Sequence, residues 1–445
     1  MRKKLMGTGI TVLLLLMVAG PVLAAGQDEE AAGGQPVTID FMHFNIREEG
    51  GNEGFFAALD QFREENADIV IREDVVQHDQ YHGSKFKTLA AANELPDLFM
   101  LNSMELRGTV KQDMLMDWTP ILDANPEWKE SFVPGLLTEV MALDRVWAIP
   151  RGLIANNAVY YNSEILSSVG YDQFPETWSE FMSLANDLKS QDIIPVAMGN
   201  KAGWVAVSNF LEILAHRTAG EEWFYSIKNN TGAAYTDPEF VRALELFKEF
   251  NDAGFFNEDV NSLDQFQVTS YYYNGEAAMY VSGSWGVGTI TREAPEDITA
   301  VTRVATMPAV PNGDGEAGVL TGGSGWSYAA NSDVEGELQD AIVRLVQAFT
   351  SPDAAAITLE LNAMPPIKRS LVEYDETKVY PLQQNMNEVM AEAPFIDTMY
   401  AVQVNPAVAE ALYRKVQEIM VGTSTPQEAA EAVQEAYEQS FITLN

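Results

Sequence analysis

Apolar and polar residues alternate with two different periods along the first hundred residues. Val37, Ile39 and Phe41 alternate with polar neighbours, which is the period of a half-buried strand. The short apolar runs at 69–71 and 98–101 indicate two further strands. Between the strands, amphipathic helices are expected after the Gly50-Gly51-Asn52 turn and near Lys85 to Ala92. Strands that alternate with amphipathic helices predict a parallel sheet covered by helices on both faces, and therefore an α/β fold.

Several later helices are marked by their first residues. Thr177–Glu180 and Thr425–Glu428 each have the spacing of a capping box, in which a hydroxyl and a carboxylate accept hydrogen bonds from free backbone N–H groups. Asp237-Pro238 and Ser351-Pro352 place a capping residue directly before a proline. These signals predict helices through the second half of the chain, including one at its C-terminal end.

The pattern changes near residue 150. The segment 146–152 is typical of a strand that ends at a proline and a glycine, and 158–161 indicates another strand. We expect the chain to cross between two lobes at this point. Asn156 and Asn157 lie near the same crossing.

The segment Tyr273–Trp285 predicts a loop, a short buried strand and then a Gly283-Ser284 turn before a tryptophan. Small residues such as Gly283 and Ser284 leave the faces of a neighbouring indole uncovered, so Trp285 can present a flat aromatic face. Such a face stacks well on the C–H side of a sugar ring. The alternative is a core tryptophan that seals the end of the strand.

The first residues have the pattern of an export signal. Arg2–Lys4 precede an apolar run at Ile10–Ala19, and Val22–Ala24 fits cleavage by signal peptidase. The run is too short and wrongly flanked for a stable membrane span. We therefore expect a signal peptide at 1–24, a flexible arm at 25–35 and a periplasmic or extracellular location.

Composition narrows the class of protein. The 445 residues include no cysteine, which excludes disulfides, thiolate metal sites and an anchor on a lipid-modified cysteine. The net charge of -38 repels nucleic acid and anionic lipid, so no nucleic-acid partner is expected. The chain is longer than one ordinary domain, and its hydrophobic content of 47% is enough to fill two cores.

Five segments in a fixed order resemble the large extracellular solute-binding proteins of carbohydrate ABC importers, the group that includes maltose-binding protein. The segments are Leu95–Leu98, Trp147–Pro150, Tyr160–Asn162 with Pro175–Trp178, Tyr273–Trp285, and Gly322–Gly325 with Ser351-Pro352 and Met364-Pro365. The resemblance runs from about Val37 to the C-terminal helix. It implies two α/β lobes joined by crossing strands, with a hinge that closes over a ligand cleft.

By this resemblance, lobe 1 covers residues 36–151 with a return segment at 289–335, and lobe 2 covers 152–288 with the C-terminal helices 336–445. The resemblance also implies that a sugar or short oligosaccharide is the ligand and that the permease subunits of an ABC importer are the partners. A monomer without cofactor, metal or catalytic activity is expected.

Sugar recognition combines flat aromatic faces with planar polar groups where loops leave the carboxyl ends of strands. Trp285 matches the stacking tryptophan of the family. Trp204 follows a predicted strand after a Gly-containing loop, and Trp326 follows a Gly-rich turn. In that turn, Gly322 and Gly323 would let the backbone approach a ligand closely. Packing within a lobe is the alternative for Trp204, and a plain turn is the alternative for the glycines.

Polar candidates follow the first strand, the third strand and the crossing strand. They are Asn45, Arg47, Asn102, Glu105 and Arg151. An ion pair between the lobes is the alternative role for Arg151. His78 and His82 have the i, i+4 spacing of a metal pair but no evident third ligand, so a solvated helix start is favoured over a metal site.

Other aromatic and histidine residues are assigned to the framework. Tyr160, Tyr161 and Trp178 match the structural positions of the family, and His43 is interpreted as strand packing. Tyr271–Tyr273 could suggest an iron site, but the basic residues that such a site needs to hold carbonate are not evident nearby.

A secreted carbohydrate-active enzyme is the main alternative function, because the acidic chain has carboxylates to spare and a glycosidase needs two of them. No acid, however, stands at a motif that suggests a raised pKa. A binding protein for a solute other than a sugar is a further alternative.

Overall fold

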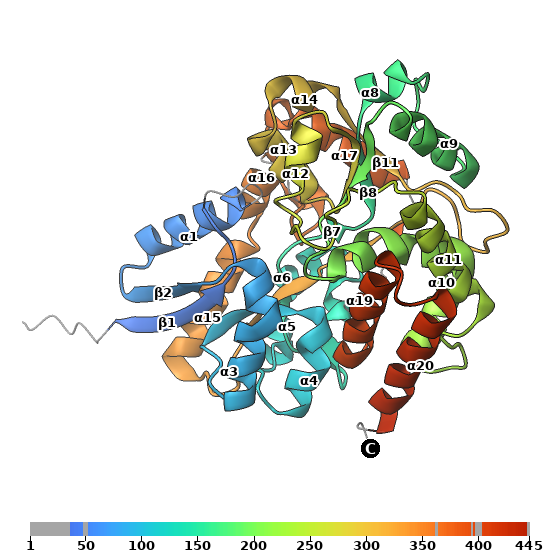
Figure 1. The fold of residues 1–445 in the computed structure, drawn as a ribbon. Coiled ribbons are helices and arrows are strands. Elements are labelled where there is room, and N and C mark those ends of the chain that lie inside the picture. Colours follow the sequence, from blue (N-terminus) through green and yellow to red (C-terminus); the bar gives the residue numbers. More distant parts are fainter. Residues whose placement is uncertain (1–35, 48–51, 361–363, 393–394, 397–402, 443–445) are drawn as a thin grey trace, which may run out of the picture. The chain divides into compact units, whose positions relative to one another are not determined.

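The computed structural model describes residues 36–47, 52–360, 364–392, 395–396 and 403–442. Val37–Asn445 forms one compact unit, and many of its elements are labelled in Figure 1. The expected signal peptide, the flexible arm and the turn at Gly50-Gly51 lie outside the described residues.

One mixed sheet has five strands in the order β2-β1-β3-β13-β6. These strands are β1 (Val37–His43), β2 (Ile69–Val75), β3 (Leu98–Asn102), β6 (Ile149–Pro150) and β13 (Trp326–Ala330). β1 is parallel to β2 and β3, whereas β13 is antiparallel to β3 and to β6. The three predicted strands are confirmed, but the all-parallel sheet is wrong at this edge. β13 returns from a distant part of the chain, so it needs no helical crossover to lie beside β3.

A second mixed sheet has four strands in the order β11-β8-β10-β9. They are β8 (Ala158–Asn162), β9 (Ile194–Ala197), β10 (Ala277–Ser282) and β11 (Thr302–Thr306). β9 and β10 are parallel, and β8 is antiparallel to both of its neighbours. Every residue of β10 is buried, as expected for a strand covered on both faces.

A short third sheet lies where the chain passes between these two sheets. It contains β7 (Ile154–Ala155), β12 (Leu320–Gly323) and β14 (Phe395–Ile396), and β7 is antiparallel to β12. β7 connects β6 of the first sheet to β8 of the second, and β12 connects β11 back to β13. The predicted crossing near residue 150 is therefore confirmed. Below, lobe 1 means the five-stranded sheet with the elements packed on it, and lobe 2 the four-stranded sheet with its elements.

Helices that lie far apart in the chain build lobe 1. α1 (Glu53–Glu65) packs against α15 (Gly336–Phe349) and α16 (Pro352–Glu360), and α15 packs against β1 (Figure 1). On the strand side, Ile39, Phe41 and Leu98 are buried, and Leu59 and Phe349 meet them from the helices. Ile39 and Phe41 are thus buried as the alternation predicts, and Met42 on the opposite face of β1 is buried in the same core. α3 (Phe86–Ala92) buries Phe86 in the same core.

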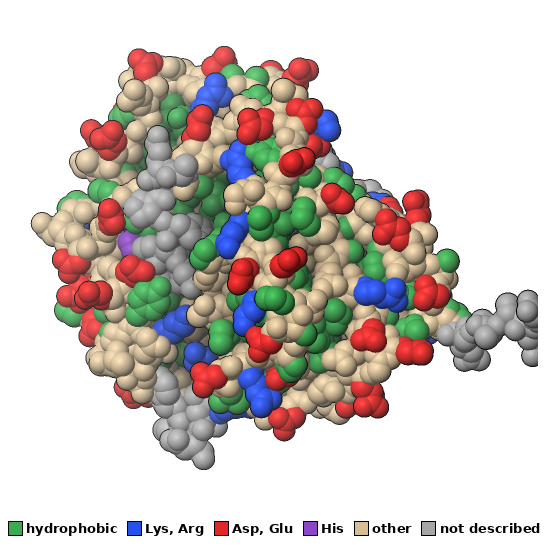
Figure 2. Space-filling view, turned by 180° about the vertical axis from the view of Figure 1, so that it is seen from behind, with side chains coloured by type: hydrophobic (Ala, Val, Ile, Leu, Met, Phe, Trp, Pro, Cys, Tyr) green, Lys and Arg blue, Asp and Glu red, His purple; other side chains and the backbone are tan. Residues whose placement is uncertain are grey.

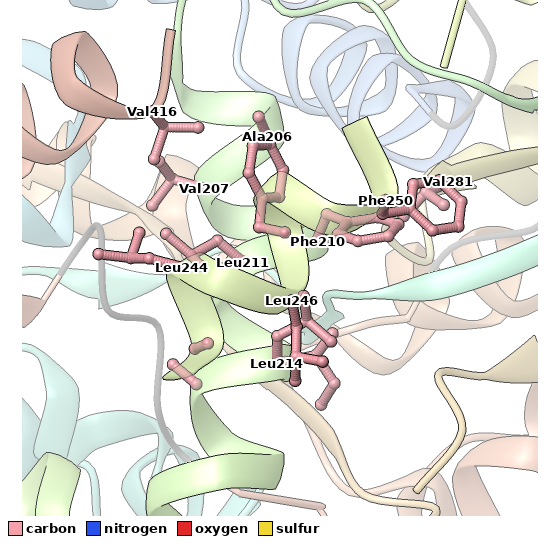
Figure 3. Close-up of a cluster of buried hydrophobic side chains, with 14 of the residues drawn as sticks. Ala206, Val207, Phe210, Leu211, Leu214, Leu244, Leu246, Phe250, Val281 and Val416 are labelled. Carbon is pink, nitrogen blue, oxygen red and sulfur yellow. The ribbon is translucent and has the colours of Figure 1, made fainter. Parts of the chain in front are cut away.

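Lobe 2 has the larger core, shown in part in Figure 3. Phe210 of η3 (Ala206–Leu211) and Phe250 of α11 (Pro238–Asp252) lie beside Val281 of β10. Val416 of α19 (Pro406–Met420) lies close to Val207 of η3. Further helices of this core include α9 (Trp178–Lys189), α10 (Glu212–Asn229) and α20 (Pro426–Ile442).

A smaller cluster on the other side of the second sheet contains Tyr160, Tyr272, Ile290 and Met386. It is formed with α12 (Thr269–Tyr273), α13 (Gly286–Glu293) and α17 (Pro381–Glu392). Tyr272 packs in a helix, which agrees with a structural role for the tyrosine run at 271–273.

The remaining elements are short. They are α2 (His78–Gln80), η1 (Tyr81–Lys85), η2 (Ser103–Glu105), α4 (Leu106–Lys111), α5 (Thr119–Ala124), α6 (Pro126–Ser131), α7 (Leu136–Glu139), β4 (Met141–Ala142), β5 (Arg145–Val146), α8 (Ser163–Ser168), α14 (Glu296–Val301), η4 (Arg369–Leu371) and η5 (Glu376–Lys378).

Both predicted capping boxes are present. The hydroxyl of Thr177 accepts from the Glu180 backbone and the Glu180 carboxylate accepts from the Thr177 backbone, and the same reciprocal pair joins Thr425 and Glu428. Asp237 stands at the N-cap of α11, but its carboxylate does not cap that helix. The carboxylate instead accepts hydrogen bonds from the indole of Trp223 and the backbone N–H of Ala234. The position of the helix start is therefore as predicted, but the expected capping bond is not made.

Two segments pack in a different lobe from the one expected. β11, within the expected lobe 1 return at 289–335, pairs with β8 in the second sheet. The helices α15 and α16, expected in lobe 2, bury their apolar faces in the core of lobe 1. The return to lobe 1 therefore comes later in the chain, at β13. The apolar stripe of a helix does not show which of two cores it will cover.

Carboxylate side chains are spread over the face of the molecule seen in Figure 2, as the net charge of -38 requires. None of the helices within the described ranges is both long and apolar enough to span a membrane.

Candidate ligand-binding site

A cavity of about 270 Å³ is lined by residues from both lobes. Lobe 1 contributes Phe44, Asn102 and Trp326, and lobe 2 contributes Trp204 and Trp285. Phe44 follows β1 and Asn102 ends β3. Trp326 starts the antiparallel strand β13 and pairs with Asn102, so it reaches the same edge of the sheet. The cavity therefore lies at the carboxyl ends of the parallel strands, where α/β proteins commonly bind ligands.

A series of aromatic rings runs along the cavity wall. The ring centroids of Trp285 and Trp204 are 6.2 Å apart, and those of Trp204 and His78 are 6.1 Å apart. His78 lies 5.5 Å from Trp326, which in turn lies 4.6 Å from Phe44. All three tryptophans are partly exposed, so each keeps ring surface that is not covered by the protein. The series passes from lobe 2 to lobe 1 between Trp204 and His78.

Trp285 is held by the turn that follows β10. Its backbone begins α13, and its indole packs flat against Gly283, where an added Cβ would lie only 2.0 Å from the ring. The carbonyl of Gly283 accepts a hydrogen bond of 2.7 Å from the hydroxyl of Tyr160. The small residues of the predicted turn thus position the indole as well as leaving it unshaded. Its contact with a ligand stays a prediction.

Arg151 lines the cavity next to the crossing strand. Its Nη2 donates to Oδ1 of Asn45 at 3.1 Å, and its guanidinium carbon lies 5.4 Å from the centroid of the Phe44 ring. Asn102 also lines the cavity, although its Oδ1 accepts from the backbone of Met104 and so caps η2. Both residues are placed where a bound solute could reach them.

His78 and His82 also line the cavity. His78 is the first residue of α2, so a helix does start here as expected, and both side chains are partly buried. Nδ1 of His78 lies 3.0 Å from a carboxylate oxygen of Asp79. Burial, with repulsion from His78 and Lys87, lowers the pKa of His82 to about 4, so His82 is uncharged at neutral pH. Both follow the end of β2. Residues that follow strand ends often line the binding site of α/β proteins, and that position could have identified both histidines from the sequence.

Five of the ten residues predicted to contact the ligand do not line the cavity. Arg47 is turned to the surface, where it forms two hydrogen bonds of 2.8 and 2.9 Å to Asp60 and lies over Phe56. Asn45 is buried behind Arg151. Glu105 lies on η2 away from the cavity wall, and burial raises the pKa of its carboxyl group.

Gly322 and Gly323 allow the close approach of other parts of the protein and not of a ligand. They pair with Ala155 and Ile154 of β7, and an added Cβ on Gly323 would lie 2.0 Å from the carboxylate of Glu139. That carboxylate accepts from the backbone N–H of Ser324 at 2.9 Å. The close approach inferred from the glycines is present, but its partner is a side chain of the same protein.

Three amide side chains on the cavity wall were not selected from the sequence as ligand contacts. They are Asn52, before α1, Asn156, on the crossing, and Gln265, before α12. Asn156 and Gln265 are buried, and the sequence around them carries no motif that separates them from other amides. No cluster of three or more His, Asp or Glu residues able to hold a metal ion occurs in the part of the chain that the structure describes.

A family model of bacterial extracellular solute-binding proteins matches residues 50–356. The chain belongs to this family. Among curated proteins, it is similar to an uncharacterised ABC transporter extracellular-binding protein of Pyrococcus horikoshii, with 25% identity over 54% of each chain. It is also similar to the multiple sugar-binding protein of Streptococcus mutans, with 21% identity over 64% of this chain and 67% of the relative. The matches span only about half to two thirds of these relatives.

Solved structures share the fold over nearly the whole chain. A chitin oligosaccharide binding protein superposes with a TM-score of 0.82 at 22% identity, covering 91% of this chain and 99% of the other. A maltose-bound protein of T. maritima has a TM-score of 0.73 at 22% identity, with coverage of 91% and 100%. The solute-binding protein thus has the two-lobed fold expected from its sequence.

Proposed function

We propose that this solute-binding protein captures a sugar or short oligosaccharide in the cavity between its lobes. The observation that carries the proposal is the series of partly exposed rings from Trp285 to Phe44, with Arg151 and Asn102 beside them. Aromatic faces cover the C–H side of sugar rings, and guanidinium and amide groups bind the hydroxyls. The sugar ligands named for the Streptococcus relative and for the two structural neighbours support the same class.

The test is a titration of the purified protein with a panel of mono- and oligosaccharides, using tryptophan fluorescence and melting temperature as readouts. Amino acids, polyamines and metal ions serve as comparison solutes. At least one sugar should change both signals, because three tryptophans line the cavity and a ligand stabilises the state that binds it. A response confined to the comparison solutes would contradict the sugar assignment.

We also propose that the protein binds its sugar without chemistry. A glycosidase generally needs two carboxylates across the scissile bond. Glu293 is the single carboxylate among the described residues that line this cavity. The bound sugar should therefore be recovered unaltered after long incubation with the protein, and any hydrolysed product would contradict the proposal.

The proposed partners are the permease subunits of an ABC importer, and the proposed location is outside the cytoplasmic membrane. Deleting the protein in its host should abolish high-affinity uptake of the sugar that it binds. N-terminal sequencing of the exported protein should begin at Ala25, after cleavage of the signal at 1–24.

A further inference from the structure

One amide on the cavity wall has both of its polar atoms without a hydrogen-bond partner within the described residues. Asn156 is fully buried and lines the cavity, and neither its amide nitrogen nor its amide oxygen has a hydrogen-bond partner among the described residues. Buried polar groups are paired in the great majority of cases, so an unpaired amide calls for a specific explanation. A ligand that supplies both an acceptor and a donor would provide one.

The backbone around Asn156 is held firmly in place. Asn157 adopts a left-handed conformation with φ of 63°, and its Nδ2 donates to the carbonyl of Ser208 at 2.5 Å. Its Oδ1 accepts from the hydroxyl of Thr321 at 2.6 Å, and the backbone N–H of Asn156 donates to the carbonyl of Thr321 at 2.6 Å. The loop is therefore fixed on both sides, which leaves the Asn156 amide pre-positioned and unpaired.

Asn156 and Trp285 start from neighbouring points of the backbone. The N–H of Ser284 donates to the carbonyl of Ala155 at 2.7 Å, and the N–H of Ala155 donates to the hydroxyl of Ser284 at 3.2 Å. Asn156 and Trp285 each follow one member of this pair, and both line the cavity. A ring stacked on the indole therefore lies at the end of the cavity that the Asn156 amide also lines.

The chemistry at this end of the cavity suits an uncharged ring. An amide offers a donor and an acceptor side by side, which matches two neighbouring hydroxyl groups. Gln265 adds a second buried amide, whose Oε1 also has no partner within the described ranges. Amides do not neutralise a carboxylate or an ammonium group, and an uncompensated charge is costly in a buried site.

We propose that Asn156 determines specificity at the Trp285 end of the cavity, by holding two neighbouring hydroxyls of an uncharged sugar ring stacked on the indole. This inference rests on the proposed function. It adds the residue that recognises the ring edge and the class of ring that fits there, namely a neutral sugar with adjacent hydroxyls rather than a sugar acid or an amino sugar.

The experiment compares Asn156→Leu with the unmodified protein. The probes are glucose, galactose, xylose, maltose, cellobiose and xylobiose, with glucuronate and glucosamine as charged comparisons. For the neutral sugar that binds, affinity should fall at least about tenfold in Asn156→Leu, because two hydrogen bonds are lost. The melting temperature of the sugar-free protein should stay the same or rise, because leucine has a similar size and removes an unpaired buried amide.

Asn209→Leu is the matched control. Asn209 is also buried, and its Oδ1 is also unpartnered within the described residues, but it lies on η3 and does not line the cavity. Its replacement should leave sugar affinity unchanged. Unchanged affinity in Asn156→Leu would overturn the inference while leaving sugar binding intact. If the unmodified protein bound a charged sugar more tightly than every neutral one, the inference would also fail.

If the unmodified protein responded to no sugar at all, both the proposed function and this inference would fail. Unchanged sugar affinity in Asn156→Leu, by contrast, would contradict this inference alone. If Asn156→Leu does not fold, the unmodified protein is titrated with monodeoxy analogues of the sugar that binds. Loss of one of two neighbouring hydroxyls should then weaken binding at least about tenfold, since the amide is again left unpaired. Equal binding of every analogue would overturn the inference.

Discussion

Arg151 donates a hydrogen bond of 3.1 Å from Nη2 to Oδ1 of Asn45. Arg151 lines the cavity, whereas Asn45 is only 1% exposed and lies behind it. Both were predicted from the sequence as ligand contacts. Their arrangement instead suggests a division of roles, in which Asn45 orients the guanidinium and Arg151 meets the solute.

Replacing Arg151 by methionine should weaken sugar binding by about 10- to 100-fold, because a charged donor to the ligand is lost. Asn45→Ala should cause a smaller loss, since the guanidinium stays present but is less well held. The double variant should bind no worse than Arg151→Met, because Asn45 acts through Arg151 and the two effects are not additive. Isothermal titration calorimetry with the sugar found in the panel measures all three affinities.

Arg47→Met is the control for that series. Arg47 was predicted alongside Arg151 but is paired with Asp60 at the surface. Its removal should leave affinity unchanged and alter stability by no more than about 1 kcal/mol, as is usual for exposed ion pairs. A tenfold loss of affinity in this variant would show that Arg47 reaches the ligand after all.

The contrast between Arg151 and Arg47 shows which features of the protein can be predicted from its sequence. Strand alternation and capping boxes predicted the α/β elements, because these features depend on local periodicity and short-range hydrogen bonds. The arrangement in two hinged lobes was expected from the resemblance of five ordered segments to a known family. Whether a loop residue faces the cavity depends on partners outside the local sequence pattern. Asp60 lies 13 residues from Arg47, and Asn45 lies 106 residues from Arg151.

The same limit explains the residues that were missed. His78, His82 and Asn156 line the cavity, but their roles depend on the partners around them and not on the identity of adjacent residues. Gly323 was noticed because a glycine in such a turn implies close approach. The sequence does not reveal that the approaching group is the carboxylate of Glu139.

Gly283→Ala should disturb the stacking surface without touching a ligand itself. The added methyl group would lie 2.0 Å from the Trp285 ring, so the indole must move away from its present position. Sugar affinity should fall about tenfold or more, and the tryptophan emission of the sugar-free protein should change. Near-native far-ultraviolet circular dichroism would show that the fold persists.

Gly108→Ala provides a control for the glycine substitution. Gly108 lies on α4, and an added Cβ there would meet nothing within 4 Å. Affinity and emission should stay as in the unmodified protein, and stability should rise slightly through helix propensity. If Gly283→Ala also left affinity intact, the position of the Trp285 indole would not matter for binding.

Gly323→Ala should reduce stability and not ligand recognition. Its φ of 155° is unfavourable for other residues, and its Cβ would clash with the Glu139 carboxylate, which is held by the backbone of Ser324. We expect a loss of about 1–3 kcal/mol in the free energy of unfolding, measured by urea titration. The folded fraction should bind sugar normally. A variant of full stability that no longer binds would instead support the original prediction that Gly323 contacts the ligand.

The stability of the protein should depend on His82 at mildly acidic pH. Burial lowers the pKa of His82 from its ordinary value near 6.5 to about 4. Between these values the unfolded chain binds a proton that the folded protein does not, so this residue lowers the free energy of unfolding as pH falls from about 6.5 toward 4. Above pH 6.5 the histidine is neutral in both states and contributes no such dependence.

His82→Gln removes this titration while keeping a polar side chain at the cavity wall. Between pH 7.5 and 4.5 the unmodified protein should therefore lose more stability than the variant, by on the order of 1–2 kcal/mol after allowance for the partial exposure of the ring to solvent. Urea unfolding at the two pH values in the absence of sugar gives the difference. Parallel losses in the two proteins would mean that His82 is protonated equally easily in the folded and unfolded chains, and so that water reaches the ring freely from the cavity.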